Sequence, residues 1–149
     1  MKKIIIGIGN LIRKDDGVGI RIAQEISRRD PNLEVVATGG VGIALLDNVV
    51  GYDQLIIIDS IRTKTGTPGQ LYKIRLEDLK PSQRLAPSHG MNLATTVQFA
   101  QGLGYEMPEH VGIYAVEIED NSHFGDSCSP NISEKIPSIA GQIMKEEML

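Results

Sequence analysis

Four shortages in this sequence each exclude a class of protein. One cysteine, Cys128, cannot form an intramolecular disulfide or supply a CxxC metal site. With two phenylalanines, four tyrosines and no tryptophan, the chain has few side chains that could stack on nucleobases. Apolar runs such as Ile4–Ile6 and Leu55–Ile58 are far shorter than the roughly 20 residues of a membrane-spanning helix. Basic residues are the minority, 15 against 19 acidic ones, and the net charge of −4 disfavours a dedicated nucleic-acid binder.

What the chain does contain suits one ordinary globular domain over residues 1–149. Apolar residues make up 41% and charged residues 23%, close to the averages of folded proteins. The first residues, Met1–Ile4, run directly into a strand-like segment without the cleavage pattern of a signal peptide, so we expect a cytoplasmic protein. No long exposed apolar stripe requires a second copy, and we therefore expect a monomer without a membrane partner.

Strand-like and helix-like patterns alternate along the chain. Runs rich in β-branched residues predict strands at Lys3–Ile8, Leu33–Thr38, Gln54–Ser60 and Val111–Ile118, and an alternating pattern predicts an antiparallel edge strand at Gly69–Leu76. Helical spacing predicts helices through Val18, Ile22 and Ile26, at Ile43–Val50, at Met91–Leu103, and from Ser129 to the C-terminal region with a kink at Pro137. This alternation predicts an α/β three-layer sandwich, α/β/α, around a five-stranded mixed, mostly parallel sheet with one antiparallel edge strand.

Three candidate functional residues belong at one edge of this sheet. Asp16 follows the first strand, Asp59 ends the third, and His89 precedes a helix that must descend from the same carboxyl edge. In such sheets ligands bind beyond the carboxyl ends of the parallel strands. Two carboxylates and an imidazole suit a divalent metal with open positions, or a carboxylate pair that moves protons beside an orienting histidine. By contrast, His110 precedes the last strand and belongs at the opposite edge.

Each of the three residues also has a purely structural interpretation. Asp16 could complement the helix dipole, and a loop histidine such as His89 is as often solvated as used. Asp59 is harder to explain in this way, because it ends a run of four aliphatic residues and a desolvated carboxylate needs a partner or a task. Their convergence on one edge favours a functional site.

Many of the 16 glycines also fall at this edge. Gly17 and Gly19 at the start of a helix imply that another group approaches closely, and Gly39 and Gly40 would let an extended substrate backbone approach. The opening loop begins like a dinucleotide-binding fingerprint, but Ile12 stands where the third glycine is needed. P-loop, G-x-S-x-G and HExxH motifs are absent from the sequence.

Together these segments resemble the hydrogenase maturation proteases along essentially the whole chain. The matching blocks are Gly7–Asn10, Asp15–Gly19, Gly39–Leu46, Leu55–Ser60, Pro68–Gly69 and Ser88–Leu93, and the tail Glu117–Gly125 with Ser129–Pro130 is similar to the branch that serves multisubunit cytoplasmic hydrogenases. The resemblance implies an endopeptidase that removes a C-terminal extension from the nickel–iron hydrogenase large-subunit precursor after nickel insertion. It also implies that Asp16, Asp59 and His89 recognise the nickel, which the precursor supplies, and that another divalent metal could bind there in crystals.

The chain departs from the family pattern after its second strand. Relatives often have Asp-Gly-Gly-Thr there, whereas this chain has Thr38-Gly39-Gly40-Val41, so no loop aspartate receives a role. With no serine or cysteine nucleophile beside a base, water is the expected attacker and Cys128 is expected to be a packed residue. The opening also resembles peptidyl-tRNA hydrolase, but the histidine expected after it is missing. A nonenzymatic nickel-dependent checkpoint chaperone that binds the precursor tail would use the same three residues, and the sequence leaves that alternative open.

Overall fold

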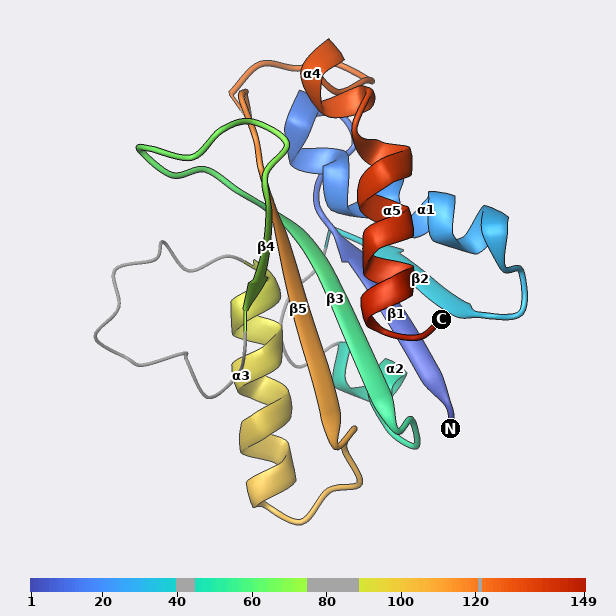
Figure 1. Cartoon of the computed structure of the whole chain (residues 1–149). Coiled ribbons are helices and arrows are strands. Elements are labelled where there is room, and N and C mark those ends of the chain that lie inside the picture. The colour runs from blue at the N-terminus through green and yellow to red at the C-terminus, as the bar shows by residue number, and fades with distance from the viewer. Residues whose placement is uncertain (40–44, 75–88, 121) are drawn as a thin grey trace.

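The computed structural model describes residues 1–39, 45–74, 89–120 and 122–149, with the backbone alone for residues 89–92. Strands and helices follow one another in the predicted order (Figure 1). The elements are β1 (Lys3–Ile8), η1 (Lys14–Gly17), α1 (Val18–Arg29), β2 (Glu34–Thr38), α2 (Leu46–Val49), β3 (Gln54–Ile61), β4 (Leu71–Ile74), α3 (His89–Gly102), β5 (His110–Glu117), α4 (Pro130–Ser133) and α5 (Ile136–Glu146).

The five strands form one mixed sheet in the order β2-β1-β3-β5-β4. All neighbouring strands are parallel except β4, which pairs antiparallel with β5 at the edge. Helices α1 and α5 cover one face of the sheet, and α2 and α3 cover the other (Figure 1). The predicted fold class, a three-layer α/β/α sandwich, is therefore confirmed.

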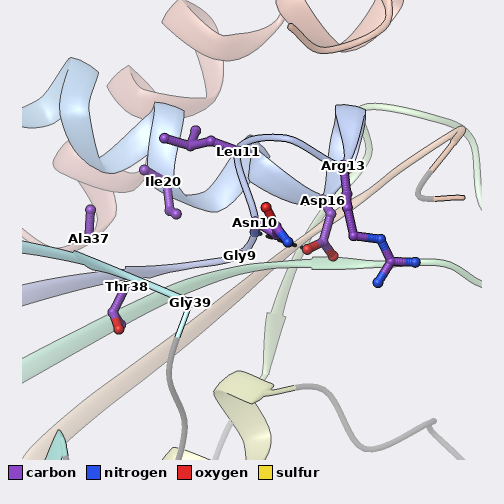
Figure 2. Close-up of a pocket in the computed structure, with 9 residues that line it drawn as sticks. All are labelled: Gly9, Asn10, Leu11, Arg13, Asp16, Ile20, Ala37, Thr38 and Gly39. Atoms are coloured by element: carbon purple, nitrogen blue, oxygen red, sulfur yellow. Dashed lines mark hydrogen bonds between the residues drawn. The ribbon is translucent and has the colours of Figure 1, made fainter. Parts of the chain in front are cut away.

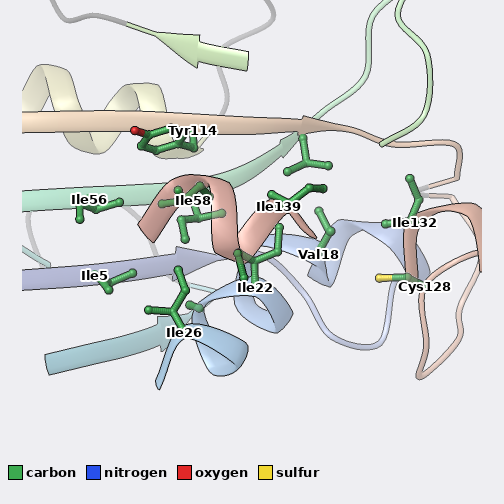
Figure 3. Packing of buried hydrophobic residues seen from close by; sticks show 14 of the residues in the cluster. Ile5, Val18, Ile22, Ile26, Ile56, Ile58, Tyr114, Cys128, Ile132 and Ile139 are labelled. Carbon is green, nitrogen blue, oxygen red and sulfur yellow. The ribbon is translucent and has the colours of Figure 1, made fainter. Parts of the chain in front are cut away.

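Each face of the sheet has its own apolar core, because successive side chains of a strand point to opposite faces. On β1, Ile5 packs beneath α1 and α5, whereas Ile4 and Ile6 pack on the side of α2 and α3. Figure 3 shows the first core, in which Ile22 and Ile26 of α1 meet the sheet. Burial on both faces explains why β1 and β3 contain nearly continuous runs of isoleucine.

The C-terminal region corrects one prediction. Instead of a single helix kinked at Pro137, two helices form, and α4 ends at Ser133 before α5 begins at Ile136. Pro137 lies in the first turn of α5, where its missing N–H has no helical acceptor to lose. In a single continuous helix, Pro137 would lie beyond the first turn and would interrupt the backbone hydrogen bonds. The chain instead ends α4 and begins α5 just before Pro137.

Other element boundaries differ only slightly from those expected. Strand β1 matches its predicted bounds, and β2 begins one residue later than expected. Helix α2 is shorter than predicted, although residues 43 and 44 of the predicted range lie outside the described part, as do residues 75 and 76 of the edge strand. No helix within the described residues has the length and apolar character needed to cross a membrane.

The topology brings three segments to the carboxyl edge of the sheet. Turn η1 follows the end of β1, β3 ends there at Ile61, and α3 starts at this edge and runs back along the sheet (Figure 1). At the opposite edge His110 opens β5 beside Gln54, as predicted. Helix α3 begins at His89, two residues before the predicted start at Met91, so His89 is the first residue of the helix and not part of the preceding loop.

Candidate functional site

A compact loop holds Asp16 above the end of β1. Asn10 stabilises this loop twice: its side-chain oxygen accepts the Ile12 N–H at 3.1 Å, and its own N–H donates to Asp16 Oδ2 at 2.9 Å. The Asp16 N–H donates in turn to the Arg13 carbonyl at 3.0 Å. The turn is thus closed on itself, and the Asp16 carboxylate has a fixed position before any ligand arrives.

Gly19 at the start of α1 and Gly9 directly after β1 are both explained by the chain's own backbone. A Cβ on Gly19 would overlap the carbonyl oxygen of Ile58 in β3, and one on Gly9 would overlap the carbonyl of Asp16. The close approach expected at this helix start therefore exists, but its partners are strand and turn backbone. These glycines let η1 and α1 lie directly on the sheet, which keeps Asp16 near β3.

Asp59 lies near the end of β3, opposite Ala115 of β5, and is only 4% exposed. Its Oδ1 accepts the backbone N–H of Ser60 at 2.8 Å. The hydroxyl of Ser60 donates to Asp16 Oδ1 at 3.3 Å. Ser60 therefore contacts both carboxylates, Asp59 through its backbone N–H and Asp16 through its hydroxyl, although 42 residues separate the two aspartates in the sequence.

The third predicted residue, His89, is placed only by its backbone, and its side chain and all of Gly40 lie outside the described part of the chain. Among the side chains that are described, no three His, Cys, Asp or Glu groups gather closely enough to hold a metal ion. A three-ligand site that includes Asp16 and Asp59 therefore needs a group beyond those side chains. His89 belongs to the segment that could provide it.

A pocket of about 530 Å³ opens beside Asp16 (Figure 2). It is lined by Gly9, Asn10, Leu11, Arg13, Asp16, Ile20, Ala37, Thr38 and Gly39. Gly39, a predicted substrate-binding residue, is exposed at its wall. Two of the lining residues are charged, Arg13 and Asp16, and the rest offer apolar surface, hydroxyl, amide and backbone groups.

Asp15 has a role that the sequence analysis did not assign. Its side chain is fully buried and accepts hydrogen bonds from the N–H and the hydroxyl of Ser129, at 2.6 and 2.9 Å. The backbone N–H groups of Asp120 and Glu119 donate to it as well, at 2.9 and 3.2 Å. Ser129 precedes α4 as predicted, but its hydroxyl binds Asp15 and makes no capping bond to the helix.

Glu117, at the end of β5, is a second buried structural carboxylate. It accepts the Thr63 N–H at 2.7 Å, the Thr63 hydroxyl, and the Tyr72 hydroxyl at 3.1 Å. Burial first, and the hydrogen bond to Glu117 second, raise the pKa of Tyr72 above its usual value. These contacts fasten the connection between β3 and β4 to the end of β5.

Cys128 is buried, as expected for a packed residue. Its thiol points to the Lys14 carbonyl at 3.9 Å, and burial raises its pKa above the usual thiol value. A nucleophilic cysteine requires the opposite, a lowered pKa and an accessible sulfur.

Comparisons with a family model and with curated proteins all indicate the same family. Residues 20–146 match the family model described as "Hydrogenase maturation protease". The hydrogenase 2 maturation protease of Escherichia coli K12 is 26% identical over 150 residues, which cover 97% of this chain and 89% of that protein. The hydrogenase expression/formation protein HupD of Thiocapsa roseopersicina is 31% identical over 147 residues, covering 91% of this chain and 63% of HupD.

Solved structures give the same result for the fold. An endopeptidase from Escherichia coli, determined in solution, aligns with a TM-score of 0.78 and 25% identity over 99% of this chain and 94% of its own. The hydrogenase maturating endopeptidase HybD from Escherichia coli also aligns with a TM-score of 0.78, at 24% identity and the same coverage.

Proposed function

Because its family model matches residues 20–146, this chain belongs to the hydrogenase maturation protease family, and from that premise we propose that it is an endopeptidase of nickel–iron hydrogenase assembly. Its substrate is the large-subunit precursor, from which it removes the C-terminal extension once nickel has been inserted. We expect it to act as a monomer in the cytoplasm.

The observation that carries this proposal is the contact of Ser60 with both carboxylates. Asp16 is partly buried and accepts two hydrogen bonds, from Asn10 and Ser60, so its oxygens retain capacity for a ligand. Asp59 and Asp16 offer oxygen ligands, and His89 would add an imidazole, a set that suits a divalent transition metal. In this proposal these residues recognise nickel as part of the precursor.

Hydrolysis in this proposal uses water as the nucleophile. The hydroxyl of Ser60 is held by its hydrogen bond to Asp16, and we assign to it a positioning role and not that of the nucleophile. Cys128 is buried and points away to a carbonyl. We therefore propose that Asp16 and Asp59 accept the proton of the attacking water. Ser60 holds both carboxylates in position. When bound, nickel would add Lewis-acid polarisation of the scissile carbonyl.

The wall of the pocket next to Asp16 suits an extended peptide. Gly39 follows the last residue of β2 and is exposed there, so its own backbone is accessible to a substrate. Gly40 extends the same segment in the sequence. We propose that this segment binds the main chain of the precursor tail, as sheet edges and their extensions bind peptides elsewhere.

A mass measurement tests this function directly. Purified protein is incubated with nickel-loaded precursor and, separately, with nickel-free precursor, and the mass of each large subunit is followed over time. We expect the loaded precursor to lose its extension and the nickel-free precursor to stay intact. Efficient cleavage of the nickel-free form would contradict the role of nickel. Stable complex formation without any loss of mass would instead favour a checkpoint chaperone.

A further inference from the structure

Arg13 places a positive charge at the pocket that contains Asp16. The two residues are the charged members of the pocket lining, and their side chains project in the same direction (Figure 2). Without Arg13, the fixed charge of this lining would be negative, and it would repel any acidic group of an arriving peptide. With Arg13, the positive charge of the guanidinium offsets the negative charge of Asp16 in this lining.

The backbone on both sides of Arg13 is held in place. The Arg13 N–H donates to the Asn10 carbonyl at 3.1 Å. Its two neighbours both pair with Gly125: the Lys14 N–H donates to the Gly125 carbonyl at 3.2 Å, and the Gly125 N–H donates to the Ile12 carbonyl at 2.8 Å. The base of the Arg13 side chain is thus preorganised, which lowers the entropic cost of using it for binding.

The side chain of Arg13 is available to bind a ligand. Within the described part of the chain its guanidinium forms no hydrogen bond and no ion pair, and the residue is exposed. The neighbouring cation differs, because Lys14 forms an ion pair with Asp120 at 3.8 Å. Of the two adjacent basic residues, the one without a partner lines the pocket.

We infer that Arg13 forms a subsite for a carboxylate in the C-terminal extension of the substrate, an inference that rests on the function proposed above. A guanidinium is the side chain best suited to this ligand, because its planar fork can donate two parallel hydrogen bonds to one carboxylate. The carboxylate could belong to an Asp or Glu side chain of the extension or to its C-terminal end. Arg13 is a specificity residue in this scheme, and the bond-breaking chemistry stays with the Asp16 site.

Replacement of Arg13 should weaken substrate binding and leave the chemical step nearly unchanged. For Arg13→Ala we expect the KM for the nickel-loaded precursor to rise roughly tenfold to hundredfold, with kcat within about twofold of the original. Arg13→Lys keeps the positive charge but loses the planar fork of donors. Its KM should therefore lie between those of the unaltered protein and Arg13→Ala. Arg28→Ala is the matched control, because it removes the same charge from the exposed side of α1, where Arg28 pairs with Glu25 at 3.0 Å. We expect that control to behave like the unaltered protein.

Three altered precursors identify the source of the carboxylate. One carries Asn and Gln in place of every Asp and Glu of the extension, another ends in a C-terminal amide in place of the carboxylate, and the third combines both changes. The source of the carboxylate is the group whose alteration abolishes the difference in KM between Arg13→Ala and the unaltered protein. On the combined precursor that difference must vanish, and a persistent tenfold difference would overturn the inference.

The affinity of the nickel-loaded precursor, measured by calorimetry, separates this inference from the proposed function. If the unaltered protein binds without cutting and Arg13→Ala still weakens binding at least tenfold, the subsite stands and the protease function fails. If the unaltered protein cuts and Arg13→Ala binds and cuts equally well, the subsite fails and the protease function stands.

Discussion

Asp15 and Asp16 are adjacent in the sequence, yet the regions of the molecule that they enter have opposite properties. The Asp15 carboxylate is fully buried and accepts four hydrogen bonds from Ser129, Asp120 and Glu119. The Asp16 carboxylate lines an open pocket and accepts two within the described structure. A carboxylate has about four lone-pair sites, so those of Asp15 are filled and those of Asp16 are not.

Because of this difference, one loop is held rigidly and still presents a carboxylate to an open pocket. Saturated contacts at Asp15 tie η1 to the segment after β5, and that segment is anchored by Gly125 to the residues around Arg13. The adjacent Asp16 is held in position by the same turn, and its carboxylate accepts only two hydrogen bonds within the described structure. Preorganisation of this kind is what a binding or catalytic carboxylate requires.

The largest expected effect is the loss of processing when one of the three predicted site residues is replaced. Asp16→Asn, Asp59→Asn and His89→Ala should each lower the rate of precursor cleavage by about 10²- to 10⁴-fold, the range associated with loss of a group that transfers protons. The measurement is the single-turnover rate of mass loss from nickel-loaded precursor, with circular dichroism as the control for folding. Unaltered activity in any one variant would remove that residue from the site.

The same substitution one position earlier should instead affect stability. Asp15→Asn leaves four buried donors facing an amide with a single acceptor oxygen, and we expect the free energy of unfolding to fall by roughly 3 kcal/mol. Asp16→Asn is the matched control and should change it by less than about 0.5 kcal/mol, because its site is partly solvated. Urea unfolding of both variants measures the contrast. A destabilised Asp16→Asn beside an unchanged Asp15→Asn would reverse the comparison.

The comparison also shows where sequence reasoning succeeds. Strand β1 and the placement of Asp16 and Asp59 at one edge follow from local patterns: β-branched runs define the strands, and parallel strands end at the same edge. The expected close approach at Gly19 also followed from a local rule, since a glycine in a first helical turn is costly. Local patterns together with the alternation of strands and helices were therefore sufficient for the fold class and for placing Asp16 and Asp59 at one edge of the sheet.

What sequence reasoning missed depends on partners far away in the chain. Asp15 and Ser129 are 114 residues apart, and no periodicity connects them, so two adjacent aspartates could not be told apart. The sequence predicts Ser60 only as the end of a strand, because nothing local indicates that its hydroxyl reaches the turn after β1. The break between α4 and α5 was also missed, because a proline inside a helical pattern can kink a helix or begin a new one.

The smallest expected effect concerns Ser60, the residue that joins the two carboxylates. Ser60→Ala removes the 3.3 Å hydrogen bond to Asp16, while the backbone N–H that donates to Asp59 remains. We expect the single-turnover cleavage rate to fall by about fivefold, equivalent to ~1 kcal/mol, the usual net contribution of one hydrogen bond. Ser60→Thr keeps a hydroxyl and should recover most of this loss. If Ser60 were the nucleophile, Ser60→Ala would lower the rate as severely as Asp59→Asn, and the assignment of water as the attacker would be wrong.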